Sequence, residues 1–383
     1  MTQRASLDAV TAWIDAHVAP LAPEPVARAD AIGRVTATDV VAPAALPARD
    51  AAALDGIALR AAETVGASAY NPLSFPLVAG AALPPGGAAR VAAGDPLPTG
   101  ADSVVALDRI EITASSCALV EPADPGGGVD RAGAHVAANG VLIRAGRRVT
   151  PSALAMLALS GIDPLAVIRR PRVRVLMARD GANRALLAAS IARDGGMPDG
   201  GVPDGVVLVG DRAALAAALG AADVDLVLTV GGTGPGAHDH AAAALADAGS
   251  VAFHGVAIRQ CETAGLGRTA RGTVVALLPG APAACLWAYE LIAGPMVRRL
   301  GGRPIGLPYE ARRMTTATKI VSGIGMVDIC PVARRGDGMV EPIASFTEAG
   351  LGAALRADGV VIVPAGSEGH ARDSEVLVYL FEA

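Results

Sequence analysis

The sequence predicts a multidomain protein of mixed α/β and β class. Its expected parts are a central doubly wound, mostly parallel α/β sheet domain, a β-rich insert domain, a helical N-terminal and linker domain, and a C-terminal β domain. Three observations predict this. The length of 383 residues exceeds what one ordinary core covers. Strand-sized apolar runs alternate with helix-sized segments between residues 172 and 300, and short strands with turn signals fill the regions on either side.

Composition excludes several classes of protein. Hydrophobic residues make up 52% of the chain and the mean hydropathy is +0.44, but alanine inflates both values, and no apolar run reaches the roughly 18 residues of a membrane span. A net charge of −5 and an aromatic content of 3% are unlike a nucleic-acid-binding surface. The sequence starts without a recognisable secretory signal. We therefore expect a cytoplasmic protein without nucleic-acid or membrane partners.

The cysteines predict neither a metal cluster nor a disulfide framework. They stand far apart and form no C-x-x-C pair, so we expect reduced, mostly buried thiols. They are Cys117, Cys261, Cys285 and Cys330.

The N-terminal part of the chain predicts two capped helices and a long β-rich stretch. Ser6 can cap a helix whose apolar residues follow helical spacing from residue 7 to residue 18. Residues 56–136 contain short strands separated by Pro, Gly and Asp turn signals. Thr150 and Pro151 open a second helix, for which Gly161 is the stop.

The segment from residue 172 to residue 300 alternates between strands and helices, which predicts a parallel sheet covered on both faces. Residues 306–383 carry short strands without a long helix, so a small β domain is expected there. Within the alternating segment we expect strands at 172–177, 206–209, 225–230 and 273–278 and helices at 184–193, 211–219, 240–248 and 283–300.

The strongest candidate site is the glycine-rich loop that follows the strand at 225–230. Free N–H groups and a helix N-terminus at the carboxyl end of a parallel strand suit phosphate or another oxyanion. Alternatively, the glycines serve only the geometry of a turn. A phosphate-binding P-loop fails because the only lysine, Lys319, lies far away, and the dinucleotide fingerprint lacks its acid. The loop contains Gly231, Gly232, Thr233, Gly234 and Gly236.

Two further segments are candidates. In the first, Pro279, Gly280 and Pro282 form a rigid loop before a helix, which is either an anion-facing geometry or a plain stop between strand and helix. The second contains Asp50 and Asp55, five residues apart in a loop. These carboxylates either hold Mg²⁺ and position a reacting group or are simply solvated loop acids.

Together and in order, these segments resemble the molybdopterin molybdotransferase family, which comprises the bacterial MoeA proteins and the E domain of gephyrin. Residues 47–58 resemble P-x-x-D-x-S-A-M-D-G-Y-A and keep Asp50, Asp55 and Gly56. Residues 94–105 resemble T-G-x-x-L-P-x-G-A-D-x-V-V, and residues 231–239 resemble G-G-[TV]-S-x-G-x-x-D. Segments 145–151, 170–173, 253–257 and 278–282 complete the order, so the resemblance covers nearly the whole chain.

The resemblance implies insertion of molybdate into adenylylated molybdopterin with release of AMP, with Mg²⁺ offsetting phosphate charge. It implies a homodimer whose site lies between the central domain of one subunit and the insert of the other. Molybdopterin adenylyltransferase and molybdoenzyme-maturation proteins are expected as further partners. The implied domains are 1–46 with 137–171 (helical and linker), 47–136 (β-rich insert), 172–305 (central α/β) and 306–383 (C-terminal β).

The resemblance also assigns roles to residues. Asp55, Asp225 and Asp239 are the expected catalytic acids, and Asp55 and Asp225 are also the expected metal ligands. The expected binding residues for adenylylated molybdopterin are Gly231, Gly232, Thr233, Gly234, Gly236, Pro279, Gly280 and Pro282.

The chain departs from the family pattern at positions that carry chemistry. Ala52 and Ala93 stand where the family has a serine and a threonine, and Ala281 replaces the asparagine of L-P-G-N-P. Residues 260–263 lack the lysine of P-G-K-P, and residues 177–184 shorten the T-G-D-E-L segment without a counterpart for its glutamate. This predicts altered or reduced activity. The alternatives are a non-catalytic molybdopterin-binding scaffold or carrier of the same fold and an unrelated nucleotide-dependent activity.

Overall fold

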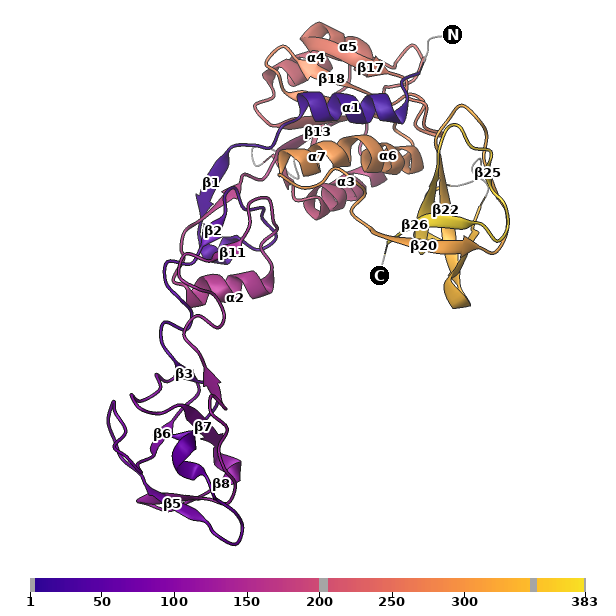
Figure 1. Ribbon diagram of the computed structural model, residues 1–383. Coiled ribbons are helices and arrows are strands. Elements are labelled where there is room, and N and C mark those ends of the chain that lie inside the picture. The colour runs from indigo at the N-terminus through magenta and orange to yellow at the C-terminus, as the bar shows by residue number, and fades with distance from the viewer. Residues whose placement is uncertain (1–3, 200–205, 345–349, 382–383) are drawn as a thin grey trace. The chain divides into compact units, whose positions relative to one another are not determined.

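The computed structural model describes residues 4–199, 206–344 and 350–381 (Figure 1). The chain forms two compact units. Unit 1 comprises residues 1–24, 33–35 and 168–383, and unit 2 comprises residues 25–32 and 36–167. The main crossings between the units fall in strands β1 (Pro23–Val26) and β12 (Leu165–Ile168), so unit 2 is an insertion in the sequence of unit 1.

The core of unit 1 is a mixed, mostly parallel sheet in the order β14-β13-β16-β19-β18-β17, with β15 also pairing with β13. Strand β13 pairs in parallel with β14, β15 and β16, and β16 pairs in parallel with β19, whereas β18 and β17 are antiparallel. The strands are β13 (Arg172–Met177), β14 (Met197–Pro198), β15 (Val206–Leu208), β16 (Leu226–Val230), β17 (Gly249–His254), β18 (Gly265–Thr269) and β19 (Val274–Leu278).

Helices cover both faces of this sheet (Figure 1). Because successive side chains of a strand point to opposite faces, Leu228 and Ala276 pack into one apolar layer and Val227 and Val275 into the other. The first layer also contains residues of α1 (Leu7–His17), α3 (Ala182–Arg193), α6 (Pro282–Ala288) and α7 (Gly294–Leu300). The second contains residues of α4 (Arg212–Ala221) and α5 (Ala241–Ala248).

The antiparallel strands β17 and β18 are not among the elements that the sequence analysis predicts. Their backbones approach so closely that a Cβ on Gly267 would lie 2.1 Å from the carbonyl oxygen of Ser250. A Cβ on Gly249 would lie 2.2 Å from the carbonyl oxygen of Arg268. Glycine is therefore required, and these same glycines interrupt the alternating apolar pattern by which strands are recognised.

The single helix predicted at 283–300 is interrupted in the structure. A π-helical turn, η5 (Tyr289–Ala293), lies between α6 and α7. It carries Glu290 into the interior, where the carboxylate accepts hydrogen bonds from Arg193 at 2.7 Å and from the Tyr309 hydroxyl at 3.0 Å. Arg298 pairs in turn with Asp194 at 2.7 Å, so these buried charges are compensated within unit 1.

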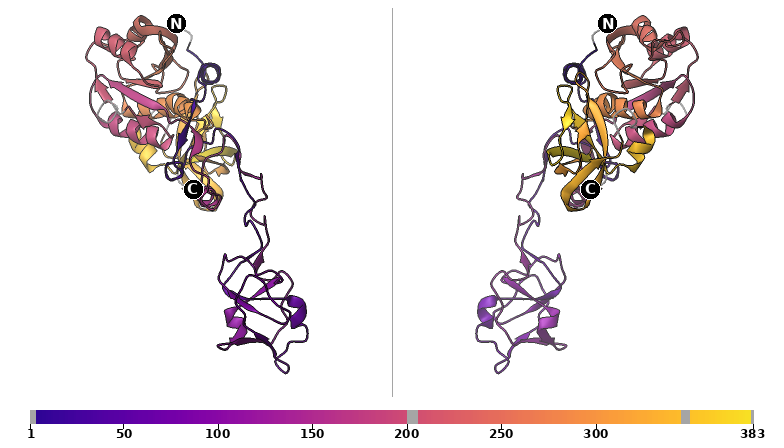
Figure 2. Two further views of the ribbon diagram at one scale, coloured as in Figure 1. Left: turned by 90° about the vertical axis from the view of Figure 1, so that its left-hand side faces the viewer. Right: turned by 90° about the vertical axis from the view of Figure 1, so that its right-hand side faces the viewer.

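The C-terminal strands form a closed barrel in the order β20-β23-β22-β24-β26 (Figure 2). Residues such as Val332, Val361 and Val378 give it an apolar core of its own. Strands β21 and β25 form a separate antiparallel pair. The elements of this C-terminal region are β20 (Glu310–Thr316), β21 (Ile320–Val321), β22 (Asp328–Arg335), η6 (Gly336–Gly338), β23 (Met339–Pro342), α8 (Leu351–Arg356), β24 (Gly359–Val363), β25 (Gly369–His370) and β26 (Glu375–Leu380).

Helix α1 begins as the sequence predicts. The Ser6 hydroxyl accepts a hydrogen bond from the Ala9 N–H at 3.1 Å, which satisfies one of the free donors of the first turn. The sequence analysis assigns residues 1–46 as a whole to the linker domain. In the structure, however, residues 1–24 belong to unit 1, because Val10, Ile14 and Val18 pack into its core.

Unit 2 contains separate apolar clusters. One includes Ile143 and Leu157 near α2 (Pro151–Leu159), which the Thr150 hydroxyl caps; the others lie among the strands between residues 51 and 130. The remaining elements are η1 (Arg28–Asp30), β2 (Val40–Val41), β3 (Ala51–Ala52), β4 (Gly56–Leu59), η2 (Ala61–Thr64), β5 (Leu73–Pro76), β6 (Ala89–Val91), β7 (Ser103–Ala106), η3 (Leu107–Arg109), β8 (Ile110–Ile112), β9 (Ser116–Leu119), β10 (Val129–Asp130) and β11 (Val141–Ile143).

Within the described residues, every helix is too short or too polar to cross a membrane. All four cysteines are buried and carry free thiols, as the sequence analysis predicts.

Candidate functional site

The chain reverses its winding between β13 and β16. After β13 it passes through α3 to β14 and β15 on one side of β13, and then through α4 to β16 on the other side. Helices α3 and α4 pack on opposite faces of the sheet. The carboxyl ends of β13 and β16 therefore flank a topological switch point, the place at which open α/β sheets bind ligands.

The glycine-rich loop (residues 231–236) follows β16 at this switch point. Gly231 and Gly232 have φ angles of +80° and +67°, a left-handed conformation that favours glycine. Gly234 is required for a different reason, because a Cβ there would lie 2.6 Å from Oδ2 of Asp239. This Oδ2 accepts a hydrogen bond from the Gly236 N–H at 2.9 Å, so the carboxylate folds back over the loop.

Three backbone donors of the loop are available to a ligand. In the described part of the chain, the N–H groups of Gly232, Thr233 and Gly234 have no acceptor. The Thr233 carbonyl accepts a hydrogen bond from His254 Nε2 at 2.9 Å, and its hydroxyl lies 2.9 Å from that of Thr263. Thr233 is thus held in place while its N–H stays unpaired. Successive free N–H groups of this kind bind phosphate and other oxyanions.

The proline loop (residues 279–282) follows β19 and approaches the glycine-rich loop closely. A Cβ on Gly280 would lie 3.2 Å from the Cα of Gly231, so the two backbones pass one another with little room. The side chain of Asn183, which is 6% exposed, donates from Nδ2 to the Gly280 carbonyl at 2.8 Å. Asn183 therefore ties α3 to the proline loop.

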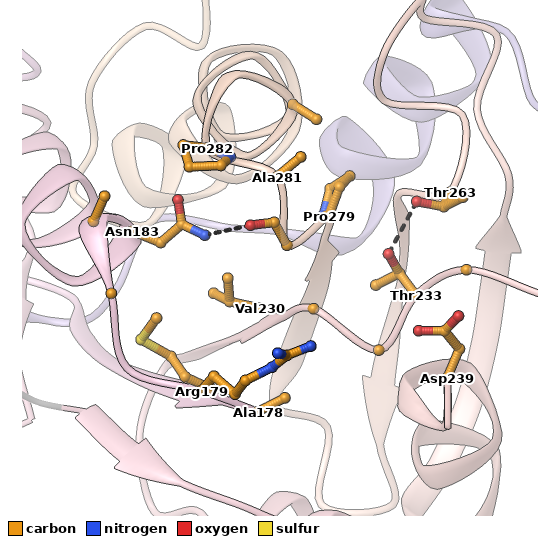
Figure 3. Close-up of a pocket in the computed structure, with 18 of the residues that line it drawn as sticks. Ala178, Arg179, Asn183, Val230, Thr233, Asp239, Thr263, Pro279, Ala281 and Pro282 are labelled. Carbon is orange, nitrogen blue, oxygen red and sulfur yellow. Dashed lines mark hydrogen bonds between the residues drawn. The ribbon is translucent and has the colours of Figure 1, made fainter. Parts of the chain in front are cut away.

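A cavity of about 630 Å³ lies between these segments (Figure 3). Its size is within the range of sites for small molecules and cofactors. Its walls come from the residues after β13, from both loops, and from Gln260 and Thr263. A second cavity of about 750 Å³ shares Thr233, Gly234 and Thr263 with the first. The site therefore has room for a ligand with two separate polar parts.

The structure brings most of the predicted binding residues together. Gly236 does not line the first cavity but donates to Asp239, which does. The predicted residues that line it are Gly231, Gly232, Thr233, Gly234, Asp239, Pro279, Gly280 and Pro282.

Asp225 does not lie at this site, in contrast to the sequence-based assignment. It precedes β16 and so lies at the amino end of the strand, about 20 Å along the chain from the glycine-rich loop. Both of its carboxylate oxygens pair with Arg169, at 2.6 and 2.9 Å, and Oδ2 also accepts from the Arg172 N–H. This carboxylate raises the pKa of Arg169 and has the geometry of a structural ion pair.

Asp55 belongs to unit 2. Its Oδ1 accepts a hydrogen bond from the Ala93 N–H at 2.8 Å, and its side chain is exposed. Asp50, five residues earlier, pairs with Arg131 at 2.7 Å and accepts from the Ala132 N–H, and these bonds lower its pKa.

The sequence analysis does not select five polar side chains that line the cavity: Arg179, Asp180, Asn183, Gln260 and Thr263. Arg179 and Asn183 follow the carboxyl end of β13, a position that alone marks them as candidates once β13 is recognised as a parallel strand. Gln260 and Thr263 lie in the segment where the family motif has its lysine, so the motif comparison places them near the ligand.

The fold and the cavity define a class of protein, namely one with an α/β domain whose cavity lies at the carboxyl ends of its strands and presents backbone donors suited to an oxyanion. Comparisons narrow this class. Residues 5–161 match the family model "MoeA N-terminal region (domain I and II)", and residues 176–299 match "Probable molybdopterin binding domain".

Relatives of known name cover most of the chain. It is 34% identical over 318 residues to molybdopterin molybdenumtransferase 2 of Mycobacterium tuberculosis, covering 75% of this chain and 76% of that one. It is 26% identical to molybdopterin molybdenumtransferase of Bacillus subtilis, covering 93% and 89%. The crystal structure of a molybdopterin biosynthesis MoeA protein from Pyrococcus horikoshii superposes with a TM-score of 0.75 at 26% identity, covering 99% and 100%. The chain therefore belongs to the MoeA family of molybdopterin molybdenumtransferases and is a transferase.

Proposed function

We propose that this protein inserts molybdate into adenylylated molybdopterin and releases AMP, at a rate below that of relatives with intact motifs. The observation that supports this most is the cavity at the switch point. The glycine-rich loop and the proline loop, which correspond to two motifs of the family, both line it. Since the free donors of the glycine-rich loop are backbone N–H groups, the capacity to bind an oxyanion does not depend on the altered side chains.

Positioning and electrostatics are the chemistry that these residues offer. The N–H groups of Gly232, Thr233 and Gly234 hold the phosphoanhydride of the substrate and stabilise charge that develops on its oxygens. Asp239 lies at the edge of the same loop. We assign to it the orientation of the water that attacks the anhydride phosphorus, with AMP as the leaving group.

The cavity fits Mg²⁺ only as an ion shared with the substrate. Among the described residues, no group of three or more His, Cys, Asp or Glu side chains forms a metal site. Mg²⁺ commonly binds through one or two carboxylates together with substrate phosphates, and Oδ1 of Asp239 has no hydrogen-bond donor in the described chain. Asp239 would hold the ion, which would offset phosphate charge when bound. Asp225 does not fit, because Arg169 and Arg172 occupy its oxygens.

The reduced rate follows from the composition of the cavity walls. Gln260, Thr263 and Ala281 line the cavity in the segments where the family pattern has a lysine and an asparagine. Loss of one positioned donor commonly lowers such a rate about 100-fold, and losses within one site do not multiply. The same losses favour, as a second candidate, a scaffold or carrier that binds molybdopterin species without turnover.

The two candidates differ in AMP release. Purified protein is incubated with adenylylated molybdopterin, molybdate and Mg²⁺, AMP is measured by chromatography, and the product is tested for reconstitution of an apo-molybdoenzyme. We expect slow release that depends on molybdate and is abolished in Asp239→Asn. Tight binding of the substrate without any release would favour the carrier, and no binding of the substrate would exclude both.

We further propose a homodimer in which a second subunit supplies Asp55 to the cavity. Complementation tests this. Asp55→Asn and Asp239→Asn are each expected to be inactive, but in a randomly mixed dimer population about one quarter of the sites combine both intact acids. Recovery of about one quarter of the wild-type rate supports the shared site. No recovery after verified subunit exchange, or a monomer in sedimentation at micromolar concentration, would contradict it.

The division into four domains also remains a proposal. Separate apolar clusters at residues 31–167 around α2, among the strands between 51 and 130, and in the C-terminal barrel support it. Limited proteolysis should cut first near residues 47, 136 and 306, which are the proposed domain boundaries. Initial cleavage inside one of the proposed domains would contradict these boundaries.

A further inference from the structure

The acidic side chains that line the first cavity have hydrogen-bond partners of their own, whereas its basic side chain does not have one among the described residues. Two acids line it, and each has hydrogen-bond donors of its own: Asp239 accepts from the Gly236 N–H, and Asp180 accepts from Arg184 at 2.8 Å and from the Gly181 N–H at 2.9 Å. These donors lower the pKa of Asp180. Of the described residues in the cavity lining, Arg179 alone has a basic side chain.

The surroundings of Arg179 also differ from those of other arginines in unit 1. Arg179 is exposed, and within the described residues its guanidinium makes no hydrogen bond or ion pair, unlike neighbouring Arg184 and the more distant Arg169. It stands two positions after the end of β13, at the edge of the sheet where the glycine-rich loop begins. In Figure 3 its side chain extends from this strand end in the direction of that loop. An unpaired guanidinium beside free backbone N–H groups can bind an anion through hydrogen bonds from both.

The opposite wall has no such charge. Gln260 and Thr263 line the cavity there, Cys261 is fully buried, and the adjoining second cavity has both Glu262 and Arg4 in its lining. Among the described residues that line the first cavity, the cationic side chain therefore lies on the β13 side. A planar guanidinium binds phosphate through two parallel N–H bonds, which a single ammonium group does not provide.

We infer that Arg179 binds the phosphate of the substrate and supplies, from the end of β13, the cation that the segment 260–263 lacks. This rests on the proposed function and deepens it, since it names the side chain on which phosphate recognition depends. The free donors of the glycine-rich loop and the guanidinium of Arg179 then share one phosphate group. Recognition in this protein consequently depends on a residue outside the family's lysine-bearing segment.

The test compares a ligand that carries phosphate with one that does not. AMP and adenosine are titrated calorimetrically into wild type, Arg179→Ala, Arg179→Lys and the control Arg271→Ala. Arg271 is an exposed arginine in the turn between β18 and β19, at the amino end of β19. We expect wild type and Arg271→Ala to prefer AMP over adenosine. Arg179→Ala should lose about 10- to 100-fold in affinity for AMP with adenosine unchanged, and Arg179→Lys should lie between them.

The outcomes separate the inference from the proposed function. If wild type binds AMP no better than adenosine, the phosphate site of the proposed function fails. If wild type prefers AMP and Arg179→Ala keeps the preference, the inference on Arg179 is overturned while the function stands. Equal losses for both ligands in Arg179→Ala, with an unchanged melting temperature, would also overturn it, because the effect would not depend on phosphate. A weaker dependence of AMP affinity on salt in Arg179→Ala supports the ion pair.

Discussion

Gly234 and the carboxylate of Asp239 compete for the same small volume. A left-handed backbone does not explain the glycine at position 234, because the left-handed residues of the loop are Gly231 and Gly232. At Gly234 the reason is space, since Oδ2 of Asp239 lies 2.6 Å from the position of a Cβ. The absence of a side chain at Gly234 therefore leaves room for the carboxylate of Asp239, and the backbone conformation at Gly234 is not the reason for the glycine.

Gly234→Val should displace this carboxylate. A shift of about 1 Å in a positioned group lowers a rate by about 100-fold, so we expect AMP release to fall by that factor. The control is Gly220→Ala in α4, where a Cβ meets no atom within 4 Å. It should leave the rate unchanged and stabilise the helix by up to about 1 kcal/mol. An unchanged rate in Gly234→Val would show that Asp239 does not act from its observed position.

Asp225 and Asp239 should separate stability from activity. Asp225→Asn leaves Arg169 without its ion pair, so we expect the free energy of unfolding to fall by about 1–3 kcal/mol in urea titrations while AMP release stays within about twofold of wild type. Asp239→Asn should abolish AMP release, a loss of at least about 100-fold, with little effect on unfolding. The reverse pattern would restore Asp225 to the site and exclude Asp239.

These two acids also show what the sequence can predict. An apolar run followed by closely spaced glycines predicts the strand and its glycine-rich loop. This prediction places Asp239 beside the cavity, where the structure has it. The family resemblance assigns Asp225 to the site, although a residue before a parallel strand lies at the amino end, away from the ligand edge. The motif comparison does not select Arg179, because the segment after β13 is shortened relative to the family motif. Its position after the carboxyl end of a parallel strand is the signal that marks it as a candidate.

Helix α1 packs against residues that lie far from it in the sequence. Val10, Ile14 and Val18 follow helical spacing and are buried in a core formed largely by residues after 172. The sequence predicts the helix and its cap from this spacing, but the spacing contains no information about which partner the apolar face will find. The same limit applies to β17 and β18, whose pairing depends on glycines that local patterns read as turns.

Ile14→Ala should therefore weaken unit 1, although Ile14 lies far from the cavity in sequence. Removing a fully buried isoleucine costs about 2–5 kcal/mol, measurable as a lower urea midpoint. Ala12→Ser, on the exposed face of the same helix, should change the free energy of unfolding by no more than about 0.5 kcal/mol. If the two variants were equally stable, α1 would not belong to this core in solution.

In the molecule as a whole, the buried cysteine thiols make the stability of the folded state depend on pH. Burial raises the pKa of Cys285 and of Cys330 from 9.0 to about 12, and it also raises the pKa of Cys117 and Cys261. Since the folded state disfavours the thiolates, their contribution to stability is complete below pH 9 and is lost as the pH rises toward 12. We expect the free energy of unfolding to decline across this window.

Thiol labelling gives a direct reading at one pH. At pH 8 a disulfide reagent should label four cysteines per denatured chain and none in the native protein within minutes, because the native thiols are buried and protonated. Rapid labelling of native protein would contradict the buried positions.

The insertion of unit 2 into the sequence of unit 1 has a consequence for synthesis on the ribosome. The backbone of Ala5 bonds to that of Gly255, and Leu21 bonds to Leu300, so α1 leaves the ribosome long before its partners exist. At about 5–20 residues per second, the roughly 250 intervening residues take about 12–50 s to translate. During that interval the apolar clusters of unit 2 can form, whereas the apolar face of α1 remains exposed to solvent. We therefore expect chaperones to bind the apolar face of α1 on the nascent chain during this interval.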